Sequence, residues 1–432
     1  MAGMLLAAGY AALILFLLGR WQGVAVEGLG VRRVSLLFLL KVAAGVALWA
    51  IYTYVYPDRA SADLFKYFDD GMVMYHALPD APTDYVRMLL GAWNDTPAFD
   101  TRYYRHMNNW YRAFDTGFYN DAHTMIRYNA LLGLFSFGQF AVHVVLAAGV
   151  ATWGSVLLYR ALLALAPHGS NALLVGIFLL PTVLLWSSGA LKENLLMTGL
   201  GAAMWGLCAG PSSAPTQRAA ALMGGIAIML LVKSYVLLGL LPGALSWALS
   251  KGRKGHAWSS FAVTHGLLLI AVLVMGGITS MNVPEILARR QTDFVNMARE
   301  VHAGSLVDLP ELDGSWASLL LAAPHALYMS FLSPLQMFGH GAMGAIAALE
   351  GGSVLILVVI LVVRQRHGRI DLPLFLWCAS FVLLLGLLIG WTTPVIGALV
   401  RYRLPILPFF ILGALALRTA QRQPLPSVHE VQ

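Results

Sequence analysis

The sequence predicts an all-α polytopic membrane protein with a single membrane domain, residues 1–417, and a disordered cytoplasmic tail, residues 418–432. Of its 432 residues, 59% are hydrophobic and only 11% are charged, whereas soluble domains have roughly 25% charged residues. The mean hydropathy is +0.71. The two cysteines, Cys208 and Cys378, both lie in apolar runs, which excludes a disulfide framework. The basic residues that give the net charge of +7 are scattered, so no nucleic-acid partner is expected.

The apolar runs predict about 11 transmembrane helices, because about 20 apolar residues cross a bilayer. In chain order, the predicted spans are 4–18, 34–56, 140–163, 172–186, 191–209, 219–232, 236–249, 261–278, 343–363, 372–391 and 404–417.

The orientation follows from the short loops, where Lys and Arg mark the cytoplasmic side. With about eleven spans, the basic loops 20–33, 251–254 and 364–369 and the tail all fall on one side. All acidic residues except Glu27, Asp371 and Glu430 fall on the opposite side or at its membrane edge. We therefore expect an integral protein of a bacterial inner membrane, with its N-terminus outside and its C-terminus in the cytoplasm.

This orientation leaves two long segments on the outer side, residues 57–139 and 279–341. Both are rich in charges and aromatic residues, which is typical of interfacial helices with Trp and Tyr at headgroup level. Residues 316–338 are apolar but contain Pro324, His325 and Pro334. They can form a twelfth span, a re-entrant pair or an interfacial helix, and we favour the last two because only then do the charges sort by side.

An acidic stretch, residues 61–71, begins where the second predicted span leaves the membrane. Asp63, Tyr67 and Asp70 share one face of a helix, with Asp69 beside them. Carboxylates at such a boundary are candidates for proton transfer or cation binding, although acids also favour helix N-termini for electrostatic reasons alone. A divalent cation could bind Asp69 and Asp70, but two adjacent acids do not establish a metal site, and no cofactor is predicted.

Three basic clusters meet the same predicted boundary: a turn between two spans, a break in an apolar run, and the entry to the last span. Their candidate residues are Lys192, Glu193, Lys233, Tyr235, Arg401 and Arg403. Snorkelling lysines and an arginine–acid ion pair are the simpler interpretations. Together with the outer carboxylates, however, the clusters suit an enzyme that handles a phosphate-bearing lipid, because guanidinium groups bind phosphate bidentately.

Three short motifs resemble the multi-spanning C-type (GT-C) glycosyltransferases, which use polyprenyl-phosphate sugars. The first motif is the acidic group Asp63 and Asp69-Asp70 in an outer loop after an early span. The second is PTVLLWSSGALKE, residues 181–193, and the third is RYRLPILPFF, residues 401–410. The resemblance covers the layout of the whole chain.

The resemblance implies an inverting transfer from a lipid-linked sugar donor to a glycan, lipid or protein acceptor at the outer face, among membrane lipids. Asp63 would be the base, with Asp69 or Asp70 as the less favoured choice. The cations of the basic clusters would stabilise the leaving phosphate, and Glu193 would orient Lys192 or bind a sugar hydroxyl. Four aromatic residues could stack on sugar rings or anchor the chain at the interface: Trp93, Tyr103, Tyr104 and Trp110.

Three other functions stay open from the sequence. An oligosaccharide polymerase or ligase would use the same kinds of residue on the same side. A transporter or flippase would need ionisable groups within its spans, and Lys41, His143, His265 and Glu350 lie in apolar runs. A non-catalytic assembly subunit would depend little on the charged boundary residues.

Overall fold

The computed structural model describes residues 2–55, 58–59, 62–111, 119–210, 213–250, 256–279, 282–339, 341–363 and 370–417. Every named element in these ranges is a helix, and the one isolated β-bridge among them joins Leu306 to Val395. The predicted tail, 418–432, and the basic loops 251–254 and 364–369 lie outside the described residues.

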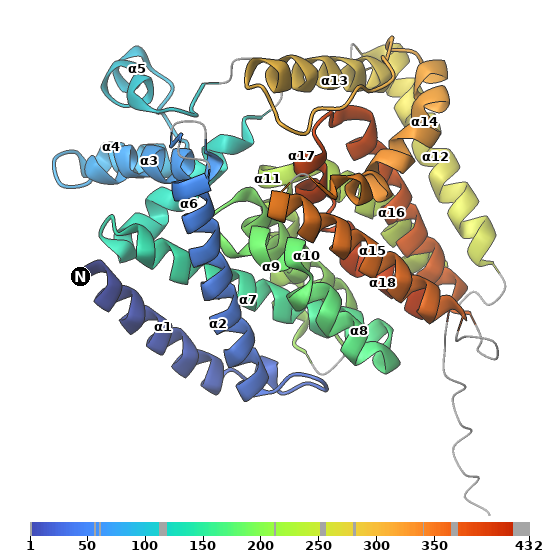
Figure 1. Ribbon diagram of the computed structural model, residues 1–432, viewed down its shortest axis with the longest axis horizontal. Coiled ribbons are helices and arrows are strands. Elements are labelled where there is room, and N and C mark those ends of the chain that lie inside the picture. Colours follow the sequence, from blue (N-terminus) through green and yellow to red (C-terminus); the bar gives the residue numbers. More distant parts are fainter. Residues whose placement is uncertain are drawn as a thin grey trace, which may run out of the picture.

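Figure 1 shows the helices, labelled in chain order. The first half of the chain forms α1 (Ala2–Arg20), η1 (Gln22–Val24), α2 (Val31–Ala50), η2 (Ile51–Val55), α3 (Asp63–His76), α4 (Pro82–Leu90), α5 (Pro97–Arg102), η3 (Tyr104–His106), α6 (Asp121–Ser136), α7 (Phe140–Leu165), η4 (Pro167–Gly169), α8 (Ser170–Leu174), η5 (Val175–Leu179), α9 (Pro181–Ser188) and α10 (Lys192–Cys208). The second half forms α11 (Pro215–Ser250), α12 (Ala257–Ile278), α13 (Val283–Glu300), α14 (Trp316–Phe331), η6 (Ser333–Met337), α15 (Gly341–Val363), α16 (Leu372–Thr392), α17 (Ile396–Tyr402) and α18 (Ile406–Ala416).

Among the described residues, seven helices are long and apolar enough to cross a membrane, and nine if each of two bent pairs counts as one span. The seven are α1, α2 with η2, α7, α11, α12, α15 and α16. The bent pairs are η4 to η5 with α9, at 46°, and α17 with α18, at 59°. Their length and composition are those of an integral membrane protein, as the sequence predicts, whereas the count of about 11 stays a prediction.

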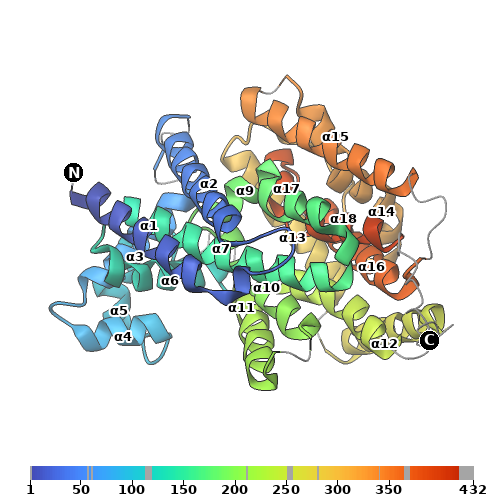
Figure 2. The ribbon, with the colours of Figure 1, turned by 90° about the horizontal axis from the view of Figure 1, so that it is seen from below.

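The membrane helices differ in how far they are covered by the rest of the chain. In the most apolar window of α7, 72% of residues are buried, against 11% in α1 and in α12. Figure 2 shows the same order, with α7 and α10 in the middle and α1, α12 and α15 at the edge. Apolar helices that the protein leaves uncovered are expected to face lipid, because water would not tolerate so large an apolar surface.

Small residues let α7, α10 and α11 approach closely, as is common between membrane helices. A Cβ atom at Gly201 of α10 would lie 2.1 Å from the carbonyl oxygen of Gly154 in α7. A Cβ atom at Gly225 of α11 would lie 2.4 Å from the backbone nitrogen of Ala203. These contacts fix α10 in the centre of the bundle, and with it the charged residues at its first turn.

Helix α11 is interrupted at Lys233, whose φ of −152° and ψ of 76° are not helical. Before the break, Gly225 and Ile228 pack against α10, and after it Gly239 and Gly243 pack against α16. The sequence predicts a break between two spans here, and the backbone does leave the helix at that residue.

The segment between α2 and α7 forms a helical cap with its own apolar core. Tyr67 and Met74 of α3, Met88 of α4 and Met125 of α6 are all buried in it. The cap and α13 lie along the same upper edge of the molecule in Figure 1. Much of the segment between α2 and α7 is therefore a packed unit rather than a set of separate interfacial helices.

Residues 316–338 form α14 and η6, which pack on the rest of the protein. Gly390 of α16 lets the backbone of Ala326 come close, since a Cβ atom there would lie 2.0 Å from its carbonyl oxygen. Ser330 donates a hydrogen bond to the carbonyl oxygen of Gly386. With 16 residues, α14 is not among the helices long enough to span.

Candidate active site

Glu193 is the centre of a buried network of ion pairs. It lies in the first turn of α10, where the helix dipole favours an acid, and its side chain is 0% exposed. Its Oε1 accepts a hydrogen bond of 2.7 Å from Lys233 Nζ, and its Oε2 lies 2.8 Å from Arg401 Nη2. Lys233 lies at the break in α11, and Arg401 lies in the short helix α17. Both carboxylate oxygens are therefore occupied by charged partners.

Asp63 is the accessible end of this network. Arg401 Nη1 donates a 3.0 Å hydrogen bond to Asp63 Oδ2, and the side chain of Asp63 is 39% exposed, against 12% for Arg401. The network thus runs from Asp63 through Arg401 and Glu193 to Lys233. Its two acids and two cations balance each other, which is the condition under which charges are tolerated away from water.

Aromatic rings cover the cations of the network. The guanidinium carbon of Arg401 lies 5.1 Å from the ring centre of Trp186, and Lys233 Nζ lies 4.2 Å from that of Tyr402. Both distances are within the range of cation–π attraction. Trp186 belongs to the second sequence motif, so that motif contributes a ring as well as Glu193.

Lys192 lies beside the network but pairs with a different acid. Its Nζ is 3.0 Å from Oδ1 of Asp121, at the start of α6, and 5.6 Å from the ring centre of Tyr67. Burial and the charge of Asp63 raise the pKa of the Tyr67 hydroxyl well above its usual value. Tyr235 is half-buried and lies near the carboxylates of Glu193 and Asp121.

Two expectations about the basic clusters are wrong. Glu193 does not orient Lys192, because its two oxygens pair with Lys233 and Arg401. Arg403 does not join Arg401; its Nη2 lies 3.5 Å from Oε1 of Glu350 in α15. Residues two apart on a helix point about 200° away from each other, and α17 ends at Tyr402, so the two arginines face different helices.

Asp69 and Asp70 do not lie with Asp63 in the network. Asp69 forms an exposed ion pair with Arg59. Asp70 is buried, and its two oxygens accept backbone N–H groups from Asn108, at 2.7 Å, and Asn109, at 2.8 Å. Burial raises the pKa of Asp70 to about 6, against the opposing effect of these hydrogen bonds. Asp70 therefore holds the loop after η3 through these hydrogen bonds. Asp69 and Asp70 have separate partners and do not face a common binding site.

Three of the four aromatic residues expected to meet sugar or lipid headgroups are buried instead. Tyr103, Tyr104 and Trp110 are each at most 8% exposed. Trp110 is sandwiched between Tyr104 and His123, with ring centres 4.0 and 3.8 Å apart, so both its faces are covered. Trp93 alone of the four is free to act as expected, with 84% of its surface exposed.

The ionisable groups within the spans have local partners. His143 contacts the side chains of Asn129 and Ser136. Glu350 accepts a hydrogen bond from the backbone nitrogen of Thr182, at the start of α9. Lys41 Nζ donates to Ser187 Oγ at 2.7 Å. Each of these contacts joins two helices. The contacts therefore give these groups a structural role that is independent of any transport pathway.

Sequence reasoning missed Asp121, Trp186 and Tyr402 as members of the site. Asp121 follows the N-cap residue Asn120 of α6, and acids are common there without any further role. Tyr402 lies between Arg401 and Arg403 of the third motif, and an aromatic residue at that position does not by itself indicate a contact with a cation. A signal was present in two motifs, since Trp186 is the aromatic residue of the second motif and Tyr402 lies between the two arginines of the third.

The described residues contain no group of three or more His, Cys, Asp or Glu side chains that could hold a metal ion. The chemistry available at the site is that of a partly exposed carboxylate, buried cations and aromatic rings. Comparison with known proteins finds no matching family model, no matching curated protein and no matching solved structure.

Proposed function

We propose that the protein is a membrane glycosyltransferase of the C type, which moves a sugar from a polyprenyl-phosphate donor to an acceptor at the outer face of a bacterial inner membrane. One observation carries the proposal. The three motifs that resemble this family are far apart in the sequence, yet their charged residues touch: Asp63 contacts Arg401, and Arg401 contacts Glu193. These contacts bring charged residues of all three motifs into one network.

In the proposed reaction the acceptor oxygen forms a bond to the anomeric carbon on the face opposite the phosphate. The bond between that carbon and the phosphate oxygen breaks, and the lipid phosphate leaves with the electron pair. The acceptor's proton passes to the carboxylate of Asp63, which acts as general base. The product is therefore inverted at the anomeric carbon.

Arg401 has a second task in this proposal. A donor phosphate that binds its guanidinium competes with Asp63 for Nη1, because both are anions. Binding of the donor then releases the carboxylate for proton transfer, while Glu193 keeps Arg401 in place through Nη2. Lys192 is 17% exposed and supplies further positive charge as the phosphate leaves.

The proposal includes about 11 spans and an outer site. Among the described residues, seven helices qualify by length and composition, or up to nine if each bent pair is one span, and the proposal takes both pairs as spans. The break at Lys233 divides α11 into two stretches, and α10 adds a short span of 17 residues. The N-terminus then lies outside, as do the cap and the ion-pair network.

The test is sugar transfer by the full chain in proteoliposomes, with polyprenyl-monophosphate hexose and pentose donors. Asp63→Asn should reduce transfer at least a hundredfold, because an amide cannot take the proton. Asp80→Asn, at an exposed position of the same cap, is the matched control and should remain active. Full activity of Asp63→Asn would remove this residue as the base.

A second experiment, in cells that lack the protein, separates the proposal from a polymerase or ligase. A transferase extends its acceptor by one sugar, whereas a polymerase joins complete lipid-linked units. Cells lacking the protein should accumulate a glycan unit short of one sugar. Accumulation of complete single units would favour the polymerase.

A further inference from the structure

Two partly exposed acids lie near the side chain of Tyr67, and only one of them has a role in the proposed reaction. Asp63 is 39% exposed and contacts Arg401. Asp121, the first residue of α6, is 25% exposed, and its Oδ1 lies 3.0 Å from Nζ of Lys192. Because Lys192 precedes Glu193 in the first turn of α10, the Asp121–Lys192 pair lies directly beside the ion-pair network.

The start of α6 is held against the break in α11. Thr124 Oγ1 donates a hydrogen bond of 2.8 Å to the carbonyl oxygen of Leu231, two residues before the break at Lys233. Residues three apart are neighbours on the surface of a helix, so Asp121 lies next to Thr124 on α6. The hydrogen bond therefore fixes the position of Asp121 relative to the network.

The exposure of the Asp121–Lys192 pair argues against a purely stabilising role. Lys192 is 17% exposed and Asp121 is 25% exposed, and ion pairs that water reaches contribute little to stability. A carboxylate has about four acceptor positions and an ammonium has three donors. A pair of this kind can therefore bind a further molecule while the ion pair itself stays formed.

The chemistry of the pair matches two neighbouring hydroxyl groups of a sugar. A hydroxyl group both donates and accepts hydrogen bonds, so one can donate to Asp121 while its neighbour accepts from Lys192. Tyr235 is half-buried near both residues, and aromatic rings beside a few polar groups are common in small-molecule sites. A lipid alcohol offers one hydroxyl on an apolar chain and would leave one member of the pair unused.

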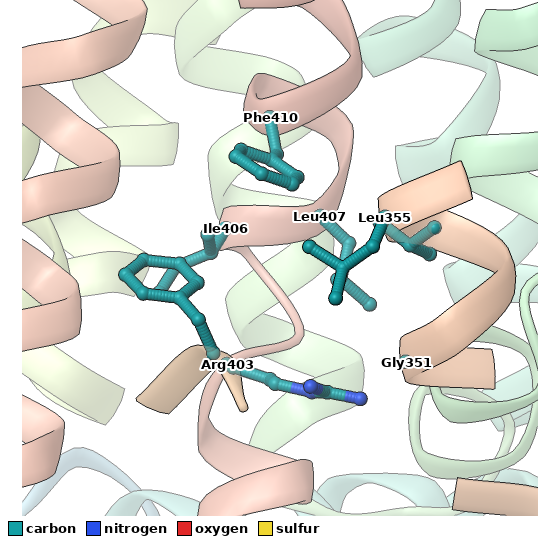
Figure 3. Close-up of a pocket in the computed structure, with 8 residues that line it drawn as sticks. Gly351, Leu355, Arg403, Ile406, Leu407 and Phe410 are labelled. Carbon is teal, nitrogen blue, oxygen red and sulfur yellow. The ribbon is translucent and has the colours of Figure 1, made fainter. Parts of the chain in front are cut away.

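Arg403 takes no part in this site. In Figure 3 its side chain extends toward Gly351, across a small cavity between α15 and α18. Its Nη2 lies 3.5 Å from Oε1 of Glu350. The positive charge near Tyr67 therefore comes from Lys192 and Arg401.

We infer that Asp121 and Lys192 bind the acceptor, and that this acceptor is a carbohydrate whose neighbouring hydroxyl groups contact the pair. Asp121 and Asp63 both lie near Tyr67, so a sugar held at Asp121 brings another of its hydroxyl groups close to the proposed base. Lys192 stays charged in this arrangement and still opposes the charge of the leaving phosphate. The role of the sugar as acceptor rests on the proposed function, whereas its binding does not.

The first experiment measures sugar binding in the absence of a donor. It uses the full chain in nanodiscs and saturation-transfer difference NMR, with methyl glycosides of the common hexoses and pentoses as probes. N-acetylthreonine amide is the probe for a protein acceptor. At least one glycoside should give a signal in the wild type that Asp121→Asn and Lys192→Gln each lower at least fivefold.

Matched controls separate the site from the general charge of the cap. Asp80→Asn and Arg87→Gln, both at exposed positions of the cap, make the same chemical changes and should bind as the wild type does. Asp121→Glu keeps the charge and should keep part of the signal. Because the pair is partly exposed, all these variants should fold, which thermal unfolding in detergent checks.

The second experiment measures transfer in proteoliposomes. Asp121→Asn should raise the KM for a glycan acceptor at least tenfold, because hydrogen bonds to a charged group are stronger than those to a neutral amide. The KM for the polyprenyl-phosphate sugar should stay within about twofold of the wild type. A merely structural role of Asp121 would change both constants together.

The inference is overturned if no glycoside gives a signal that depends on Asp121, or if the threonine probe gives the stronger Asp121-dependent signal. Transfer to a glycan with an unchanged KM in Asp121→Asn would refute the acceptor site and leave the proposed reaction standing. Sugar binding that depends on Asp121, in a protein that transfers nothing from any donor, would refute the reaction and leave a sugar-binding site.

Discussion

Arg401 and Asp63 are 338 positions apart in the chain, and their side chains meet at 3.0 Å. The pair joins the cap, through the first residue of α3, to the bent pair α17–α18 at the other end of the sequence. Because Arg401 also contacts Glu193, a change at any of these residues alters the electrostatics of the others. The first prediction follows from that coupling.

Glu193→Gln should destabilise the folded protein by roughly 3–5 kcal/mol, because it leaves Lys233 and Arg401 buried without their shared carboxylate. Adding Lys233→Met should recover part of the loss, since one unpaired cation is then removed. Thermal unfolding in detergent of the single and double variants measures both effects. Strictly additive losses would mean that the two residues are not coupled.

Arg401→Gln should weaken donor use in the transfer assay, raising the KM for the lipid-phosphate sugar and lowering kcat. Arg401→Lys should lie between this variant and the wild type, because a lysine cannot contact Asp63 and Glu193 with a rigid fork. Arg87→Gln serves as the exposed control. An unchanged KM and kcat in Arg401→Gln would show that the phosphate is bound elsewhere.

Asp70 should make the cap lose stability as pH rises. Its pKa is raised to about 6 in the folded protein, so between about pH 4 and pH 6 the folded state holds a proton that the unfolded state has released. Stability therefore falls across this window and levels off above it. The measurement is the unfolding temperature against pH for the wild type minus that for Asp70→Asn. A difference that does not vary with pH would contradict the expectation.

Lys41→Met should leave stability unchanged or improve it. The amine is buried in α2 and donates to Ser187 Oγ, while that hydroxyl also donates to the carbonyl of Val183. Methionine removes a buried polar group and leaves the serine bonded. Ser187→Ala, by contrast, takes an acceptor from the amine and should cost roughly 1–3 kcal/mol. A large loss in Lys41→Met would point to a further role for the amine.

Gly201→Ala should destabilise the bundle by roughly 1–3 kcal/mol or more, because the new methyl group would press on the Gly154 backbone. Gly266→Ala in α12 is the matched control, since nothing lies within 4 Å of its Cβ position. There the change should be neutral or slightly stabilising through helix propensity. Thermal unfolding of both variants measures the effect. Equal losses of stability in the two variants would argue against close packing of α7 and α10.

Much of the architecture could be predicted because apolar runs identify membrane helices without knowledge of their neighbours. The interruption of one run predicted the break at Lys233, and the spacing of Asp63, Tyr67 and Asp70 predicted the helix that carries Asp63. The convergence of Asp63, Glu193, Lys233 and Arg401 followed from a sidedness argument and not from any local pattern. The function of that group stays a prediction.

The misassignments share a physical cause, which is that a side chain's partner depends on tertiary packing. Helical spacing correctly put Asp70 on the face of Asp63, but the loop at Asn108 and Asn109 reaches over and occupies it. Arg403 lies two residues from Arg401, and the end of α17 turns it toward Glu350. For Trp110, composition alone could not distinguish an exposed ring from one between Tyr104 and His123.

The Asp63–Arg401–Glu193 chain of contacts has a consequence for biosynthesis. The ribosome makes α3 and α10 long before α17, and chains fold as they emerge. Until Arg401 arrives, Glu193 has only Lys233 to pair with, and Asp63 lacks its partner. A nascent chain that stops before α17 would therefore carry a half-neutralised acid in its interior, a defect that membrane quality control could recognise.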